Sequence, residues 1–218
     1  ASGYGIAIHC HRSTTAAQAL ADELNAARAH SAFVLQQDLA LPEAASALLA
    51  QLLEHRSRLD LLVNSASIFE ASPIDSSAVT NWDRMQAINT RTPYFLSVAA
   101  APLLRRQHGA VVNITDIHAA RPRLDYAMYC ISKAVLIAVT KALALELAPE
   151  VRVNAVSPGA ILWAASEDEQ LQAKAVAATP LQRRGEPSDI AAAVTYLASA
   201  PYVTGQVIEV DGGRSLNM

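Results

Sequence analysis

The chain has 218 residues, a mass of 23.1 kDa and a formal net charge of −3. Apolar residues make up 52% and charged residues 17%, which excludes intrinsic disorder, and no apolar run approaches the ~18 residues of a membrane span. The small negative charge gives no electrostatic reason to expect binding to nucleic acid or to an anionic membrane. One globular domain is therefore expected, and two distant cysteines with no secretory-type leader predict a cytoplasmic protein with reduced thiols.

Apolar runs typical of buried strands alternate with helix-like segments along the whole chain. In chain order, the expected strands are residues 6–10, 32–36, 61–64, 110–115, 151–156 and 206–210. The expected helices are residues 14–28, 42–55, 79–107, 126–147, 168–178 and 188–198. Pro93 and Pro102 are expected to interrupt the third helix. The alternation predicts an α/β fold, a doubly wound, parallel, Rossmann-like sheet between two layers of helices, in a single domain.

Ligands of doubly wound sheets bind beyond the carboxyl ends of the strands. His11, Arg12 and Ser13 follow the first expected strand, where a fold that prefers NAD carries an acidic side chain. A guanidinium and a hydroxyl suit a 2′-phosphate, so the sequence predicts NADP(H) as the cofactor. A solvated loop arginine is the alternative interpretation. Two histidines, His9 and His11, do not make a ligand set for a metal by themselves, so no metal site is expected.

Two further strand ends carry residues that are expected to contact the cofactor. Asp38 and Leu39 follow the second strand, and Asp38 either accepts a hydrogen bond from the adenine amino group or caps the next helix. Asn64, Ser65 and Ala66 follow the third strand. These side chains are small or polar, which would allow the backbone to pass close to a ribose of the cofactor.

The most specific signal is the pair Tyr129 and Lys133, which lie four positions apart on one face of the long expected helix. A lysine ammonium beside a phenol favours the phenolate, so we expect the pKa of Tyr129 to fall from about 10 toward neutrality. A phenol of lowered pKa is a usable general acid. The pair follows a strand that ends near Asp116 and precedes a strand that ends at Pro158 and Gly159.

Together these features resemble the short-chain dehydrogenase/reductase family over essentially the full 218 residues. The residues that carry the resemblance are Asn64 to Ser67, Asn89, Tyr129, Lys133, Val153, Asn154, Pro158, Gly159 and the run Asp211-Gly212-Gly213. The resemblance implies that Tyr129 donates a proton and that Lys133 holds the nicotinamide ribose and lowers the pKa of Tyr129. It also implies that Asn89 supports a water relay behind Lys133. The residues it places among the cofactor contacts include Thr115, Pro158, Gly159, Tyr129 and Lys133.

One departure narrows the resemblance. Asp116 stands where the family usually has a catalytic serine, and a carboxylate accepts from ring nitrogens and amino groups. Asp116, Tyr129 and Lys133 together look like the pteridine reductases, in which an aromatic at the position of Phe69 stacks on the pterin. This implies NADPH-dependent reduction of a pterin of the dihydropteridine, biopterin or folate type. Tyr129 is then the proton donor, and the implied substrate contacts are Ser67, Phe69, Asp116 and Tyr129.

Other interpretations stay open. Tyr126 and Lys133 lie seven positions apart and match the enoyl-thioester reductase version of the family, although Tyr129 shares a helix face with Lys133 within one turn. A carbonyl or quinone reductase and a non-catalytic NADP(H)-binding sensor are further alternatives. Asp116 could instead cap a turn or a helix without a role in the chemistry. Phe69 could instead make an ordinary hydrophobic contact.

Glycine is scarce, at 8 of 218 residues, and none of the eight forms a glycine-rich loop between a strand and a helix. Such a loop follows the first strand of a dinucleotide fold. We therefore expect residues 1–218 to be a single NADP(H)-binding reductase domain that lacks its first strand, glycine loop and first helix. The resemblance also implies a homotetramer built on the 126–147 helix and the C-terminal strand.

Overall fold

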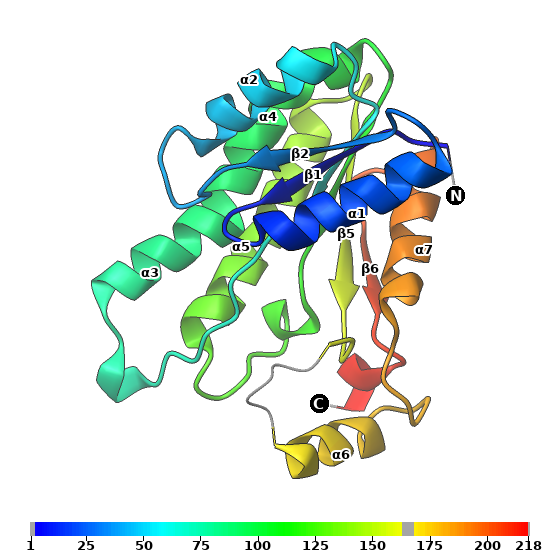
Figure 1. The fold of residues 1–218 in the computed structure, drawn as a ribbon. Helices are drawn as coiled ribbons and strands as arrows, with labels where there is room; N and C mark the ends of the chain where they lie inside the picture. The colour runs from blue at the N-terminus through cyan, green and yellow to red at the C-terminus, as the bar shows by residue number, and fades with distance from the viewer. Residues whose placement is uncertain (1–2, 163–167, 218) are drawn as a thin grey trace.

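The computed structural model describes residues 3–162 and 168–217. Its strands are β1 (Ile6–Cys10), β2 (Ala32–Gln36), β3 (Leu61–Asn64), β4 (Ala110–Ile114), β5 (Arg152–Pro158) and β6 (Val207–Val210). Its α-helices are α1 (Thr14–Ala27), α2 (Ala44–His55), α3 (Val79–Gln86), α4 (Thr92–Arg105), α5 (Ala127–Glu146), α6 (Glu169–Ala177) and α7 (Pro187–Ser199). Strands and helices alternate along the chain, so the predicted Rossmann-like α/β class is confirmed (Figure 1).

All of the described strand pairs are parallel, and they form two separate parts of a sheet. In the smaller part β1 pairs with β2, from Ile6 opposite Ala32 to Cys10 opposite Gln36. The larger part has the order β3, β4, β5, β6. Within each part the carboxyl ends of the strands lie at one edge, where ligands bind in this class of fold.

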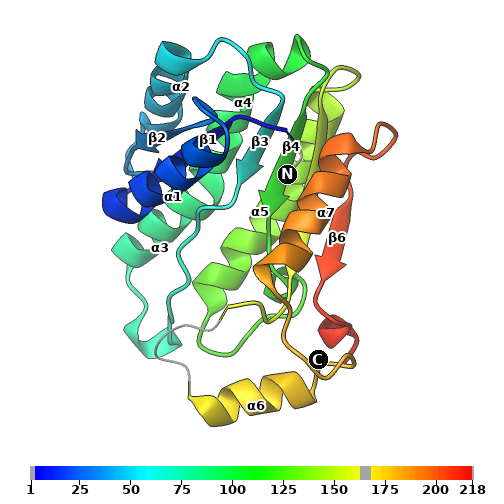
Figure 2. The same cartoon turned by 45° about the vertical axis from the view of Figure 1, so that its right-hand side comes forward.

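Helices cover both faces of the four-stranded part, with α4 and α5 on one face and α7 on the other (Figures 1 and 2). The core on the first face consists of Ala100, Ala101, Leu104, Val111, Leu143, Ala144, Leu147, Val151 and Val153. On the other face, Val112 and Val156 pack against Leu197 of α7. Burial on both faces explains why the central strands are apolar at nearly every position.

The smaller part of the sheet is attached to the larger part by helix packing. α1 covers the β1–β2 pair, and α2 packs against α4. Leu48 and Leu52 of α2 share a buried cluster with Leu103 of α4. The Thr92 hydroxyl donates to the Leu39 carbonyl at 2.8 Å and adds a polar tie at the same junction.

Residues of β1 and β3 line the two sides of one cavity of about 1090 Å³, which we call the sheet gap. Ile6 and Val63 are apolar strand residues, yet they are 43% and 38% exposed. The Ile6 N–H bonds to the Ser31 carbonyl on the β2 side, so the alternation of a strand directs the N–H groups of Ala7 and His9 toward the gap. β1 and β3 therefore each have an edge whose backbone N–H and C=O groups form no hydrogen bonds to another described strand.

The region expected as one helix over residues 79–107 consists of three elements. α3 ends at Gln86, the residues Ala87–Arg91 form a π-helical turn, and α4 begins at Thr92. The helix was expected to be interrupted at Pro93 and Pro102, but the interruption lies at residues Ala87–Arg91. Pro93 lies in the first turn of α4, where its missing N–H is not needed, and Pro102 lies inside α4 without ending it.

One described helix, α5, is long and apolar enough to cross a membrane, with a mean hydropathy of 1.7. The expectation that no segment has the length and hydropathy of a membrane span is therefore wrong for α5. Half of the tested window is buried inside the protein, and the helix carries the buried polar residues Ser132, Lys133 and Thr140. A core helix has the same length and composition, and α5 packs against β5.

Candidate functional site

The carboxyl end of β4 positions Thr115 and Asp116. Thr115 is buried, and its hydroxyl donates to the Val156 carbonyl at 3.0 Å, which joins the ends of β4 and β5. Asp116 caps the short 3₁₀ turn Ile117–Ala119, because its Oδ1 accepts from the His118 N–H at 2.8 Å. The carboxylate is thus held in place by its own backbone, and its second oxygen points toward α5.

Tyr129 lies in the first turn of α5 and is 5% exposed. Its hydroxyl donates to Oδ2 of Asp116 at 2.8 Å, so the two residues form one hydrogen-bonded unit. Burial, followed by the charge of Asp116, raises the pKa of Tyr129. The expected lowering of this pKa by Lys133 is therefore wrong, because burial of the phenol and the Asp116 carboxylate that accepts its hydrogen bond both raise the pKa.

Lys133 lies one turn further along α5 and is almost completely buried. Its Nζ donates to the Ile114 carbonyl at 2.9 Å and lies 5.7 Å from the centre of the Tyr129 ring. Burial lowers the pKa of Lys133 to about 8, and the charge of Asp116 opposes this shift. The four-residue spacing thus brings Tyr129 and Lys133 to the same strand end, as predicted.

Asn89 sits in the π-helical turn and is almost completely buried. Its Nδ2 donates to the Ile68 carbonyl and to Ser132 Oγ, both at 3.0 Å. Its Oδ1 accepts from the Ile68 N–H at 2.9 Å and from Ser67 Oγ at 3.1 Å. Asn89 therefore ties the segment that carries Ser67 and Phe69 to the residue beside Lys133.

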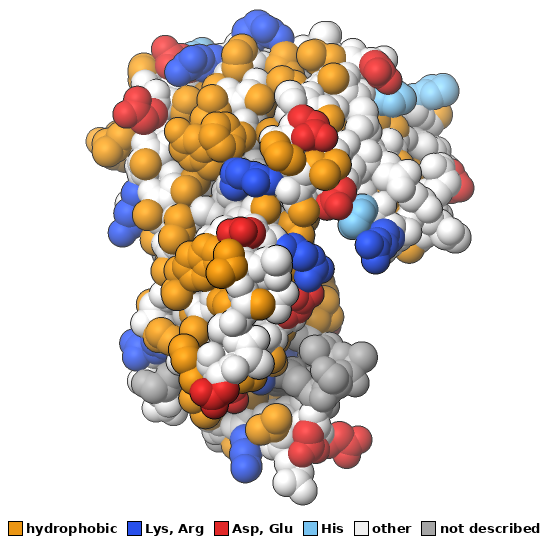
Figure 3. All heavy atoms as spheres, turned by 90° about the vertical axis from the view of Figure 1, so that its left-hand side faces the viewer, with side chains coloured by type: hydrophobic (Ala, Val, Ile, Leu, Met, Phe, Trp, Pro, Cys, Tyr) orange, Lys and Arg blue, Asp and Glu red, His pale blue; other side chains and the backbone are white. Residues whose placement is uncertain are grey.

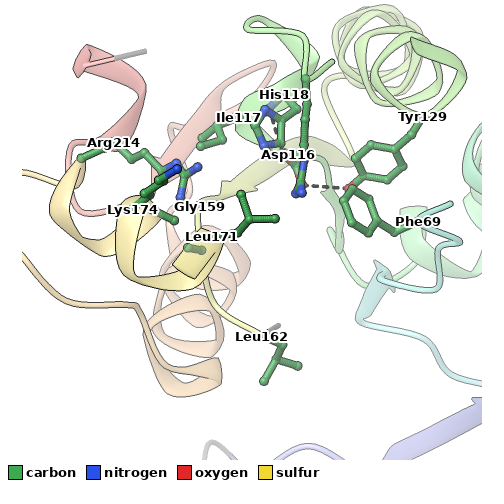
Figure 4. Close-up of a pocket in the computed structure, with 14 residues that line it drawn as sticks. Phe69, Asp116, Ile117, His118, Tyr129, Gly159, Leu162, Leu171, Lys174 and Arg214 are labelled. Atoms are coloured by element: carbon green, nitrogen blue, oxygen red, sulfur yellow. Dashed lines mark hydrogen bonds between the residues drawn. The ribbon is translucent and has the colours of Figure 1, made fainter. Parts of the chain in front are cut away.

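Phe69 borders the same pocket as Asp116 and Tyr129 (Figure 4). Its ring stacks on Tyr126 at 4.5 Å between centroids and meets the edge of Tyr129 at 4.7 Å. The Arg123 guanidinium lies 4.5 Å from the Tyr126 ring centre and 5.5 Å from that of Phe69. Tyr126 thus supports Phe69 through its ring face, whereas Tyr129 makes the hydrogen bond to Asp116.

Asn64 at the end of β3 is buried rather than directed toward solvent. Its Nδ2 donates to Asn113 Oδ1 at 2.8 Å and to Ser97 Oγ at 3.2 Å. The side chain is therefore a tie between β3, β4 and α4, and only its backbone remains for a cofactor. Ser65 and Ala66, which follow it, are exposed beside the sheet gap.

The end of β1 forms a separate, exposed rim. His11, Arg12 and Ser13 are all exposed, and His11 Nε2 lies 3.6 Å from Oδ2 of Asp38. Asp38 also accepts from the Ala40 N–H at 2.9 Å, whereas the Leu39 side chain is buried in the core. In Figure 3 the right-hand outline of the molecule is indented, and a basic and a histidine side chain lie at the upper rim of this indentation.

The pocket beside Tyr129 has a volume of about 510 Å³ and reaches Gly159 at the end of β5. Four basic lining residues were not expected from the sequence, namely His118, Arg123, Lys174 and Arg214. His118 and Arg123 lie within seven residues of Asp116, so position after a strand end was a usable signal for them. Lys174 and Arg214 come from the C-terminal part of the chain, and nothing local in the sequence marks them.

The predicted residues lie in three places. Phe69, Asp116, Tyr129 and Gly159 line one pocket. Arg12 and its neighbours lie at the end of the smaller part of the sheet, and Asn64, Ser65 and Ala66 lie beside the sheet gap. Within the described residues, no group of three or more His, Cys, Asp or Glu side chains is placed to hold a metal ion.

Comparison with known families decides the assignment of the fold. A family model described as enoyl-(acyl carrier protein) reductase matches residues 1–215. The chain belongs to this family of short-chain dehydrogenases/reductases. As a member of it, the chain is an oxidoreductase.

Relatives within the family differ in substrate. The chain is 36% identical to granaticin polyketide synthase putative ketoacyl reductase 2 of Streptomyces violaceoruber, over 99% of this chain and 88% of that protein. It is 33% identical to pteridine reductase 1 of Leishmania tarentolae, over 99% and 89% respectively. The crystal structure of FolM alternative dihydrofolate reductase 1 from Brucella canis, complexed with NADP, is similar with a TM-score of 0.90 and 33% identity, over 99% of this chain and 86% of that one.

Replacing Lys133 by Met should stabilise the fold at pH 7. Burial lowers the pKa of Lys133 to about 8, below the ordinary value of 10.5 that it regains on unfolding. Below pH 8 the ammonium is charged in both states and its burial cost is present in full. Between pH 8 and 10.5 the folded state releases the proton first, so wild-type stability rises relative to the variant.

Urea unfolding at pH 7 and pH 10 measures this difference. We expect Lys133→Met to raise the free energy of unfolding by up to about 3 kcal/mol at pH 7 and by less at pH 10. Lys141→Met, at an exposed position of the same helix, is the control and should show no such pH dependence. A difference between Lys133→Met and wild type that is the same at both pH values would contradict the prediction.

Proposed function

We propose that this oxidoreductase reduces a C=N bond of a pterin with NADPH, and that Tyr129 donates the proton. The observation that carries the proposal is the 2.8 Å hydrogen bond between Tyr129 and Asp116, next to the partly exposed ring of Phe69. It puts a proton donor, a hydrogen-bond acceptor and a stacking surface in one pocket. The similarity to a pteridine reductase and to a dihydrofolate reductase supports the same chemistry.

Asp116 favours a nitrogen heterocycle over a carbonyl compound. An ionised carboxylate only accepts hydrogen bonds, so it matches the amino and N–H groups of a pterin. During carbonyl reduction negative charge develops on the substrate oxygen, and a carboxylate beside that oxygen opposes it. A ketoacyl or enoyl-thioester reductase is therefore the less suitable assignment, even though such enzymes are among the relatives.

The end of β1 fits the 2′-phosphate of NADP(H). Arg12 offers a planar fork of donors, and Ser13 makes no side-chain cap to α1, so its hydroxyl is available to an anion. The first turn of α1 contains no acidic residue, and its unpaired N–H groups add to the positive potential. Arg12 and Ser13 would thus hold the phosphate, while Lys133 and the residues at the end of β3 would hold the nicotinamide ribose.

Each residue of the catalytic group has a distinct part in the reaction. The bound NADPH supplies the hydride. Tyr129 is protonated at neutral pH, as a phenol already is at its ordinary pKa of about 10, so it holds the proton that the reduced nitrogen needs. Asp116 orients that hydroxyl, and the Lys133 ammonium stabilises the phenolate that remains after proton transfer. Asn89 holds Ser67 and Phe69 at the edge of the pocket.

The two tyrosines provide the direct test of the assignment. With NADPH and dihydrobiopterin, Tyr129→Phe should lower kcat by at least about 100-fold, because it removes the proton donor and keeps the ring. Tyr126→Phe keeps the ring that stacks on Phe69 and should stay within a few fold of wild type. Consumption of NADPH at 340 nm measures both rates.

Three outcomes would contradict the assignment. The first is loss of activity in Tyr126→Phe with Tyr129→Phe still active, which would favour the enoyl-thioester arrangement. The second is turnover of a crotonyl or ketoacyl thioester with no turnover of dihydrobiopterin or dihydrofolate. The third is binding of NADPH without turnover of any of these substrates, as a non-catalytic sensor would behave.

Arg12 should determine the preference for NADPH over NADH. Removing its guanidinium by Arg12→Ala takes away a charge-assisted contact to the 2′-phosphate, so the dissociation constant of NADPH should rise about tenfold or more. That of NADH, which lacks this phosphate, should change little. Fluorescence titration of both cofactors measures the two constants, and an equal change in both would show that Arg12 is a solvated loop residue.

We also propose that a further strand fills the sheet gap and completes a single NADP(H)-binding domain. The unpaired N–H groups of Ala7 and His9 and the exposed Ile6 and Val63 support this, because a parallel apolar strand between β1 and β3 would satisfy all of them. The residues that lead from such a strand into a helix would supply the phosphate-binding loop next to Arg12.

The polypeptide isolated from its natural host tests this proposal. Its intact mass should exceed 23.1 kDa by ~2 to 3 kDa, at about 110 Da per residue for one strand, loop and helix. Hydrogen exchange should also find the amides of Ala7 and His9 protected. A mass of 23.1 kDa, or rapid exchange at both amides, would refute the proposal.

The assembled enzyme, we propose, is a cytoplasmic homotetramer whose contacts include α5 and the edge strand β6. Ile131 and Val135 of α5 are 43% and 39% exposed and lie one turn apart, so the helix presents an apolar surface there. Phe95 of α4 is also exposed, and Figure 3 shows hydrophobic side chains grouped on the face where α2, α3 and α4 lie. Apolar groups of this kind are typical of subunit interfaces.

A further inference from the structure

The pocket beside Tyr129 contains a hydrogen-bonding side chain that the proposed reaction does not use. His118 lines this pocket together with Asp116 and Tyr129, and Figure 4 shows it next to Asp116. The residue is half-buried and belongs to the 3₁₀ turn Ile117–Ala119, which follows β4. A pocket of about 510 Å³ is large enough for a small-molecule ligand, so the imidazole is placed where a substrate can reach it.

One nitrogen of the His118 ring is bound to the backbone. Nδ1 lies 3.0 Å from the carbonyl oxygen of Arg121. A carbonyl oxygen only accepts hydrogen bonds, so Nδ1 carries the hydrogen of this contact. In a neutral imidazole the other nitrogen then has a lone pair and no hydrogen. Nε2 of His118 is therefore an acceptor, and it makes no hydrogen bond or ion pair with any residue that the structure describes.

The same short turn holds both acceptors of this part of the pocket. Oδ1 of Asp116 accepts from the His118 N–H at 2.8 Å, and the Asp116 carbonyl accepts from the Ala119 N–H at 3.0 Å. The contact with Arg121 holds the imidazole ring against the end of the turn. The carboxylate and the ring are thus oriented by the backbone before a ligand arrives, so binding to them costs little side-chain entropy.

We propose that Nε2 of His118 accepts a hydrogen bond from a donor group of the pterin, an N–H, an amino or a hydroxyl group, and that His118 thereby determines specificity. This inference rests on the proposed pterin reduction. It goes beyond that proposal because it adds a second acceptor beside Asp116, so that the pocket selects substrates with two donor groups. A substrate oxygen that only accepts would face the Nε2 lone pair and leave both groups unpaired.

The alternative role for His118 is to hold the turn through Nδ1 without contact to the substrate. Two amide side chains separate the two roles, because each resembles one half of the imidazole. In His118→Asn the amide nitrogen lies close to the position of Nδ1, so the contact with the Arg121 carbonyl is kept and the acceptor at the position of Nε2 is lost. In His118→Gln the amide reaches the position of Nε2, so an acceptor is kept there and the contact with Arg121 is lost.

Steady-state kinetics with saturating NADPH and dihydrobiopterin measures the difference. In His118→Asn the KM for dihydrobiopterin should rise about three- to tenfold with kcat little changed, because one hydrogen bond to the bound substrate is missing. His118→Gln should restore the KM to within about twofold of wild type. The reverse pattern, with His118→Asn like wild type and His118→Gln impaired, would show that His118 only holds the turn and would overturn the inference.

A second substrate identifies the donor group. A dihydropterin with a methyl group in place of the hydroxylated side chain retains the ring N–H and amino groups. If the donor belongs to the ring, His118→Asn should raise the KM for both substrates, and if it is a hydroxyl of the side chain, only the KM for dihydrobiopterin should rise. Unchanged KM values for both substrates would overturn the inference.

Calorimetric titration of the NADP-bound enzyme with both pterins supplies a readout that does not need turnover. If the pterins are reduced and His118→Asn binds them as wild type does, the inference fails and the proposed function stands. If the pterins bind without being reduced, and His118→Asn weakens their binding whereas His118→Gln does not, the acceptor role of His118 stands and the proposed function fails. If they neither bind nor react, both fail.

Discussion

The hydrogen bond from Tyr129 to Asp116 is the interaction on which the site depends. It connects α5 to the carboxyl end of β4, and the same carboxylate caps the turn that follows the strand. One side chain therefore fixes a backbone turn and orients a phenol. Both carboxylate oxygens of Asp116 accept hydrogen bonds from the protein. The orientation of the carboxylate is therefore fixed before a substrate binds to it.

Two unfavourable features of the chain support this arrangement. Lys133 buries an ammonium, which costs folding free energy, and its bond to the Ile114 carbonyl only partly compensates. The π-helical turn departs from regular helix geometry, and it brings Asn89 into contact with Ser132 and with the loop that carries Phe69. Irregular backbone and buried charge are thus concentrated where the site is held together, as in many functional sites.

The sequence predicted the elements and the catalytic pair because both depend on local spacing. Apolar runs located the six strands, and a separation of four residues put Tyr129 and Lys133 on one face of α5. The raised pKa of Tyr129 could not be predicted, because it depends first on burial and then on Asp116, which lies thirteen residues away and meets Tyr129 only after folding. Lys174 and Arg214 escaped notice for the same reason, since only tertiary packing brings them to the pocket.

The division of the sheet has a consequence for cooperativity. Helix packing and a few polar ties hold the β1–β2 part, with Arg12 at its end, to the four-stranded part that carries the catalytic residues. Among the described elements, such an interface would open at a lower free energy than the strand-paired core of β4 and β5. The strand proposed for the sheet gap would remove this difference, because it would pair with both β1 and β3. A dinucleotide that touched both parts would add a further link, since by mass action a bound cofactor stabilises the folded state that binds it.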